Sequence, residues 1–217
     1  MTRFTAFFTS SVGRKLLMWL TGFFLCSFLL IHLGINLFLF KSDNGGTFDA
    51  YAEFMATYPF IRPLEVVLFA GFLLHGFVGT WLWVANRTAR PVRYEENRPQ
   101  ENSTLASRSA FLTGALVLVF LVVHVNTFFV RSRFFPRGET MYELVREAFQ
   151  RPWYVVFYLV ALVFLAFHLK HGFQSAFQTF GLRHKKYDRL IDAVGVVFWL
   201  LIPAAFAAMP LYFLWAH

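Results

Sequence analysis

Charged residues and cysteine are both scarce in this sequence. Charged residues make up 15% of its 217 positions, whereas soluble domains usually contain about 25%. The single cysteine, Cys26, excludes an intrachain disulfide and a paired-cysteine metal site. The sequence also has no glycine-rich nucleotide-binding pattern and no serine-nucleophile elbow. These absences argue against a self-contained soluble enzyme and assign any substrate site to partner proteins.

Apolar residues account for 58% of the sequence, and phenylalanine alone occurs 30 times. A membrane-spanning helix needs about 20 apolar residues, and it satisfies its own backbone hydrogen bonds in lipid. We therefore predict one all-α integral membrane domain over residues 1–217, with five transmembrane helices at about 15–40, 64–87, 108–131, 152–180 and 190–215. The underlying runs without a formal charge are Leu16–Phe40, Val66–Asn86, Ser109–Val130, Pro152–Leu169 and Ala193–Ala216.

The first apolar run is too long for a typical signal peptide and lacks a small-residue cleavage site, so we expect it in the mature protein. The net charge of +8 comes from Lys and Arg that flank the runs, which favours membrane anchoring over nucleic-acid binding. The N-terminal segment and the second and fourth loops carry more of these residues than the first and third loops. This bias predicts a cytoplasmic N-terminus in the cytoplasmic (inner) membrane of a bacterium.

The connecting loops and the last apolar run give three further predictions. The second loop, Asn86–Ser107, is either a solvated connection or a docking surface for a soluble partner, helped by the basic fourth loop. The third loop contains an amphipathic pattern over Thr140–Gln150, which predicts a short helix along the outer membrane surface. Pro203 and Pro210 fall inside the last run, where neighbouring helices can satisfy the carbonyl groups that a proline leaves free.

Four histidines lie within the apolar runs, one in each of the first four: His32, His75, His124 and His168. An ionisable side chain at membrane depth is costly and therefore indicates a function. A lone histidine there is more often a neutral imidazole that is hydrogen-bonded across a helix interface. Four such residues, one in each helix, are difficult to explain separately in that way. They favour a common role.

The depths of the four histidines suggest how they pair. His32 and His124 lie near the charged residues that close the outer ends of their runs, whereas His75 and His168 lie farther from the corresponding charges. The difference corresponds to roughly 10 Å along the membrane normal at 1.5 Å per residue. Two imidazoles from different helices can supply both axial nitrogens of one haem iron. We therefore predict two b haems, an outer one held by His32 and His124 and an inner one held by His75 and His168.

Glycine follows each histidine of the inner pair by four residues. Gly79 and Gly172 therefore share a helical face with His75 and His168 and would leave room for a flat macrocycle. The alternative is ordinary small-residue packing between membrane helices. His171 lies one turn beyond His168, and we expect it beside the haem rather than on the iron.

Other polar residues are candidates for secondary roles. Haem propionates need compensating charge near the membrane surface, although membrane anchoring explains the same basic residues equally well. Glu53 and Glu65 are candidates for proton exchange with a quinone beside the outer haem, or they are simply solvated. The candidate propionate partners are Arg14, Lys15, Arg87, Arg108 and Lys170 on the inner side and Arg131 and Arg133 on the outer side.

Several motifs around the histidines are distinctive. Span one contains Leu-Ile-His32-Leu-Gly-Ile-Asn, span two contains Leu64-Glu65 and then Leu-Leu-His75-Gly, and span three contains Leu-Val-Val-His124. The most specific is Phe-His168-Leu-Lys-His171-Gly172-Phe-Gln-Ser-Ala-Phe-Gln-Thr-Phe-Gly181, followed by His184-Lys-Lys-Tyr. Through these motifs, and over almost its whole length, the sequence resembles the cytochrome b558 membrane-anchor subunits of succinate dehydrogenases and of related fumarate reductases with one five-helix anchor.

The resemblance implies that one polypeptide carries two b haems, each held by two histidines from spans one and three or from spans two and four. His32, His75, His124 and His168 occupy the matching positions. It also implies a flavoprotein subunit that oxidises succinate, an iron–sulfur subunit that relays electrons, and a menaquinone site near the outer haem. Glu53 or Glu65 is the expected counterpart of an acidic residue that some members use near the quinone.

Three alternatives remain at this point. The same machinery could run in reverse as a quinol:fumarate reductase. The chain could be the cytochrome b of another membrane oxidoreductase such as a hydrogenase, although five spans and the span-four motif weigh against this. A haem-free transporter with a histidine and glutamate proton relay belongs to a different class, and it should have charged or unwound helix centres. The runs show few of these.

Overall fold

The computed structural model describes residues 10–89, 104–179, 181, 184 and 186–215. The structure contains no strand among these residues, which confirms the all-α prediction. Its elements in chain order are α2 (Ser11–Asn36), η1 (Leu37–Phe40), α3 (Gly46–Thr57), α4 (Ile61–Thr88), α6 (Leu105–Arg108), α7 (Ala110–Val125), η2 (Asn126–Val130), α8 (Arg131–Phe134), α9 (Met141–Phe149), α10 (Pro152–Thr179), α11 (Asp188–Val196), η3 (Val197–Leu201) and α12 (Ile202–Trp215).

Five helical stretches are long and apolar enough to cross a membrane, which confirms the predicted spans. Their bounds differ from the predicted ones by a few residues, because a helix can begin or end outside the apolar run. The first, for example, begins after Ser10, whose side chain accepts a hydrogen bond from the backbone N–H of Gly13. The stretches are Ser11–Phe40, Ile61–Thr88, Ala110–Phe134, Pro152–Thr179 and Asp188–Trp215.

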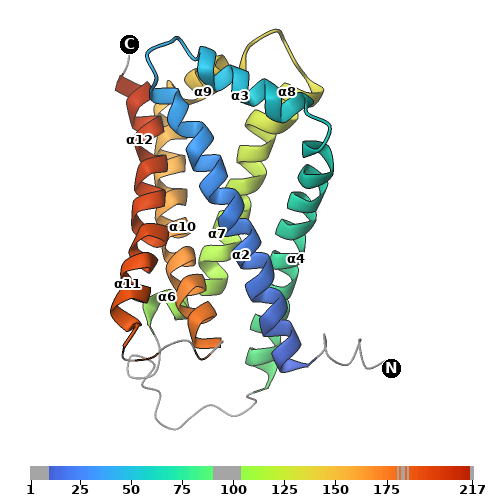
Figure 1. Ribbon diagram of the computed structural model, residues 1–217, viewed down its shortest axis with the longest axis vertical. Coiled ribbons are helices and arrows are strands. Elements are labelled where there is room, and N and C mark those ends of the chain that lie inside the picture. Colours follow the sequence, from blue (N-terminus) through green and yellow to red (C-terminus); the bar gives the residue numbers. More distant parts are fainter. Residues whose placement is uncertain (1–9, 90–103, 180, 182–183, 185, 216–217) are drawn as a thin grey trace.

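The first four spans form a bundle with α12 packed on its outside (Figure 1). Helix α2 packs against α4 and α10, and α7 packs against the same two helices. The pairs α2 with α7 and α4 with α10 are therefore diagonally opposite. In Figure 1, α3, α8 and α9 lie across one end of the bundle, the α9 end, whereas α6 and the start of α2 mark the α6 end.

The predicted amphipathic helix of the third loop is present as α9, Met141–Phe149. A capping box starts it, because the Thr140 side chain accepts from the Glu143 backbone N–H while the Glu143 side chain accepts from the Thr140 backbone N–H. Its apolar face is buried through Leu144, Val145, Ala148 and Phe149. This face closes the α9 end of the bundle.

The first loop contains a helix, α3, that the sequence analysis did not predict. The loop turns at Asn44 and Gly45, which have φ values of 55° and 84°. A Cβ atom at Gly45 would overlap the ring of Tyr142 on α9, so this position requires glycine for space as well as for backbone conformation. The backbone N–H of Tyr142 also donates to Asp49 Oδ1 on α3 at 2.8 Å. Helix α3 is thus docked on α9.

The buried side chains gather at the α9 end rather than along the whole bundle. Helices α10 and α12 bury much larger shares of their side chains than α2, α4 and α7 do. The main buried cluster consists of Leu39, Phe48, Phe128, Leu144, Val145, Ala148, Phe149, Tyr154, Val155, Tyr158, Met209 and Phe213.

Two π-helical turns interrupt the membrane-spanning helices. The π-helical turn Val197–Leu201 precedes Pro203, which cannot donate a backbone hydrogen bond, and Pro210 lies within α12. A second π-helical turn, Asn126–Val130, begins two residues after His124. Most of the second loop, residues 90–103, lies outside the described residues, and so does the predicted docking surface there.

Candidate functional site

The four membrane-embedded histidines meet in two pairs. The rings of His32 on α2 and His124 on α7 have centroids 5.8 Å apart and planes at 89°. The rings of His75 on α4 and His168 on α10 have centroids 6.1 Å apart and planes at 76°. Each pair comes from diagonally opposite helices, so its members face each other across the bundle. We refer to them as the α9-end pair and the α6-end pair, respectively.

The ring separations match those of two imidazoles that share one metal ion. Such rings have centres about 6 Å apart, since a metal–nitrogen bond is about 2 Å and the nitrogen lies roughly 1 Å from its ring centre. Among the described residues, no group of three or more His, Cys, Asp or Glu could hold a bare metal ion. Two histidines alone suit an iron that has its other four positions filled by a porphyrin. The donor set therefore fits haem better than an isolated ion.

The two pairs lie farther apart along the bundle than the sequence suggested. His168 of the α6-end pair lies beside Gly114 of α7, and His124 of the α9-end pair is ten residues farther along the same helix. At 1.5 Å per residue this corresponds to about 15 Å, instead of roughly 10 Å.

Aromatic and polar groups enclose the α9-end pair. The Nδ1 atom of His124 lies 2.6 Å from the hydroxyl oxygen of Tyr158, a buried residue of α10. The ring of Phe128 lies 5.3 Å from that of His124 between centroids. Asn36 Nδ2 donates to the His32 carbonyl oxygen at 2.8 Å and lies 3.3 Å from His32 Nδ1. His124 is thus held by a side chain of α10, and His32 by a residue one turn along its own helix.

Three small residues that the sequence analysis missed position the α6-end pair. The Thr21 hydroxyl oxygen on α2 lies 3.1 Å from His75 Nδ1. A Cβ atom at Gly22 would lie 3.5 Å from His75 Cε1, and a Cβ atom at Gly114 would lie 3.1 Å from His168 Cε1. Each glycine therefore admits an imidazole from a neighbouring helix. Spacing along one helix could not reveal them, because each contact is made across an interface.

The two glycines that the sequence analysis selected, Gly79 and Gly172, have different surroundings, and their role beside a macrocycle stays a prediction. A Cβ atom at Gly79 would meet Met18 Cε at 3.4 Å, and one at Gly172 would meet no atom within 4 Å. Gly172 thus has open space on its Cβ side. The half-buried His171 lies one turn from His168 toward the α6 end. The ring that pairs with His75 is that of His168.

Three of the candidate propionate partners lie over tryptophan rings near the α6 end. Arg14 lies 5.0 Å from the Trp81 ring centroid, Arg87 lies 5.4 Å from that of Trp83, and Lys170 lies 4.5 Å from that of Trp199. Tryptophan with a neighbouring cation is typical of the membrane–water interface. Of the other candidates, Lys15 and Arg108 are exposed, and Arg133 Nη1 donates to the Ala56 carbonyl oxygen at 3.1 Å.

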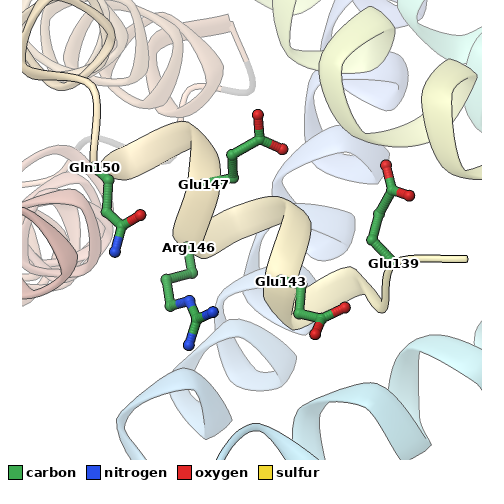
Figure 2. A pocket seen from close by; sticks show the side chains of 5 residues that line it. All are labelled: Glu139, Glu143, Arg146, Glu147 and Gln150. Atoms are coloured by element: carbon green, nitrogen blue, oxygen red, sulfur yellow. The ribbon is translucent and has the colours of Figure 1, made fainter. Parts of the chain in front are cut away.

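Arg131 has carboxylate partners on the α9 side. Its Nη2 atom lies 2.6 Å from Glu139 Oε1 and 3.0 Å from Glu147 Oε2, which joins α8 to α9. Hydrogen bonds from its own backbone and from Arg131 lower the pKa of Glu139. Figure 2 shows Glu139 and Glu147 on one side of α9 and Glu143 and Arg146 on the other. These carboxylates already have protein partners, so the acidic surface is not a cation site.

The two candidate proton-exchanging carboxylates both lie at the α9 end. Glu53 is exposed on α3. Glu65, near the start of α4, accepts a hydrogen bond from Arg62 Nη1 at 2.7 Å. They are on the same side of the bundle as the His32–His124 pair, and the structure records no contact of either with a histidine among the described residues.

No protein-family model matches the chain, and no solved structure matches it either. Among curated proteins, the chain is 25% identical over 157 residues to the protein named succinate dehydrogenase cytochrome b558 subunit from Bacillus subtilis (strain 168). The alignment covers 71% of this chain and 72% of that relative. The relative carries the name of the family that the sequence motifs resemble, which confirms the resemblance.

Proposed function

We propose that this chain is the cytochrome b membrane subunit of a succinate dehydrogenase. It anchors a flavoprotein subunit and an iron–sulfur subunit to the bacterial cytoplasmic membrane and conducts their electrons to menaquinone. The observation that carries the proposal is the meeting of four histidines in two pairs, at 5.8 Å and 6.1 Å between ring centroids. The name of the relative supports the choice of complex.

The ligand assignment follows from the pairs. His32 and His124 would hold one b haem, and His75 and His168 would hold the other. Held in this way by two histidines, each haem would supply one-electron transfer rather than oxygen or substrate chemistry. The chain's own part is to supply the imidazole nitrogens, to fix their orientation, and to exclude water with residues such as Phe128 and Tyr158.

The two ends of the bundle suggest different tasks. We place the α6 end in the cytoplasm, in agreement with the excess of basic residues before span one and in the second and fourth loops. The soluble subunits would dock there, nearest to the His75–His168 pair. Menaquinone would react near the α9 end, where Glu53 and Glu65 are the candidate groups for proton exchange. The α9 end is covered by α3, α8 and α9 (Figure 1).

Affinity purification of the tagged chain from its native membrane tests this proposal. We expect flavoprotein and iron–sulfur subunits to co-purify, and the complex to reduce a menaquinone analogue with succinate as electron donor. A preparation that contains haem but no succinate-oxidising partner would assign the chain to a different oxidoreductase. A preparation without haem absorption would favour the transporter alternative, because that class needs no iron.

A further inference from the structure

We propose that Thr21 is a positioning residue for His75. Its hydroxyl oxygen accepts a hydrogen bond from His75 Nδ1–H, which holds the imidazole in one tautomer and leaves Nε2 unprotonated as the ligand atom. The inference rests on the proposed haem function of the His75–His168 pair. It adds a residue of another helix that sets the orientation and the tautomer of the His75 imidazole.

The direction of the hydrogen bond follows from the surroundings of the Thr21 hydroxyl. Its oxygen lies 3.0 Å from the Leu17 carbonyl oxygen and 3.1 Å from the Met18 carbonyl oxygen, on its own helix. A hydroxyl group has one proton to donate. If that proton pointed to His75, the hydroxyl oxygen would face two carbonyl oxygens without a hydrogen between them. The proton therefore points to the carbonyl groups.

The contact between the Thr21 hydroxyl oxygen and His75 Nδ1 then requires that His75 donate the hydrogen. His75 Nδ1 lies 3.1 Å from the Thr21 oxygen, so it must carry the proton for the contact to be a hydrogen bond. A neutral imidazole with its proton on Nδ1 has a free electron pair on Nε2. The same helix that bonds Nδ1 also admits the ring, because Gly22 follows Thr21 and leaves space beside His75 Cε1.

His168 Nδ1 lacks a side-chain hydrogen-bond partner among the described residues, and the polar group that acts on His168 is the Ala110 backbone of α7. Thr21 itself is buried, with 8% of its surface exposed, so water does not readily replace its hydroxyl. Within the α6-end pair, the side-chain contact to a ring nitrogen is therefore the one between Thr21 and His75 Nδ1.

A hydrogen bond of this kind alters the ligand as well as its orientation. An acceptor on Nδ1–H makes the imidazole a stronger donor at Nε2, and loss of such a partner typically weakens metal binding about 10–100-fold. A stronger donor stabilises the oxidised iron more than the reduced iron, which lowers the reduction potential. Thr21 should therefore lower the potential of the α6-end haem and leave the other haem unaffected.

Thr21→Val tests this inference, because valine keeps the shape of threonine and removes only the hydroxyl. The purified complex is titrated optically to obtain the midpoint potential of each haem, and haem loss to an excess of a haem-scavenging protein is timed. We expect the potential of the α6-end haem to rise and its retention to fall about 10–100-fold. The His75→Ala variant, which keeps only the other haem, identifies which optical transition belongs to which site.

Two further variants separate positioning from packing. Thr21→Ser restores the hydroxyl and should restore both the potential and the retention. Ser27→Ala removes a hydroxyl that bonds the Phe23 carbonyl oxygen on the same helix, and it should change neither. Equal potentials in Thr21→Val and the unmodified protein, with both haems bound, would overturn the inference while leaving the proposed function intact. Absence of haem from the unmodified protein would overturn the proposed function itself.

Discussion

Replacement of His75 or His168 by alanine is expected to remove the same haem, and replacement of His32 or His124 is expected to remove the other. Each substitution deletes one of two axial ligands, and an iron with a single imidazole loses both affinity and its low-spin character. Each variant should therefore retain roughly half of the haem of the unmodified protein. Haem content and the reduced-minus-oxidised spectrum of each purified variant measure this directly.

The pairing can be checked within the same series. His75→Ala and His168→Ala should leave identical residual spectra, and the double variant should lose no more haem than either single one. His171→Ala is the matched control on α10, because its ring is one turn from that of His168, and it should retain both haems. Loss of a haem in His171→Ala together with retention in His168→Ala would show that the ligand in span four is assigned incorrectly.

Gly114→Val is expected to disrupt the α6-end haem site without a change in any ligand. A Cβ atom at this position would lie 3.1 Å from His168 Cε1 and 3.4 Å from His168 Nδ1, and the branched side chain of valine extends beyond it. The imidazole must then move out of line with His75, and overpacking of this kind costs about 1–3 kcal/mol. We expect about 10–100-fold weaker retention of that haem alone.

Gly34→Val provides the control for this substitution. Gly34 is also a glycine within a membrane-spanning helix, but a Cβ atom there would meet no atom within 4 Å. The control variant should retain both haems with unchanged spectra. If Gly114→Val also retained both with unchanged spectra and retention times, the close approach of His168 to α7 would not matter for cofactor binding.

The sequence was most informative where a pattern depends on one helix alone. Long apolar runs predicted the five spans because lipid imposes the same requirement on each of them separately. The third-loop helix was predictable because Thr140–Gln150 carries its apolar residues on one helical face. Helix α3 was missed because the turn residues Asn44 and Gly45 indicate a loop, whereas its stability depends on contacts with α9.

In the candidate site, too, the sequence predicts features of a single helix but not contacts between helices. The four histidines were recognisable because an ionisable group at membrane depth is unusual wherever its helix packs. Thr21, Gly22 and Gly114 could not be recognised in the same way, because each contacts a histidine of another helix. The sequence does not show which residues of neighbouring helices lie side by side. Gly79 and Gly172 were selected because each lies four residues after a histidine on the same helix. A sequence shows such spacing within one helix directly, but it does not show which residues of different helices face each other.

The central claim is that two imidazole pairs in one chain bind two haems, and the haem content of the purified, unmodified protein tests it most directly. Quantitative haem extraction with protein determination should give about two b haems per chain, and the spectrum should show only low-spin iron. A ratio of one or less, or a spectrum dominated by high-spin iron, would mean that the two pairs do not both hold a cofactor.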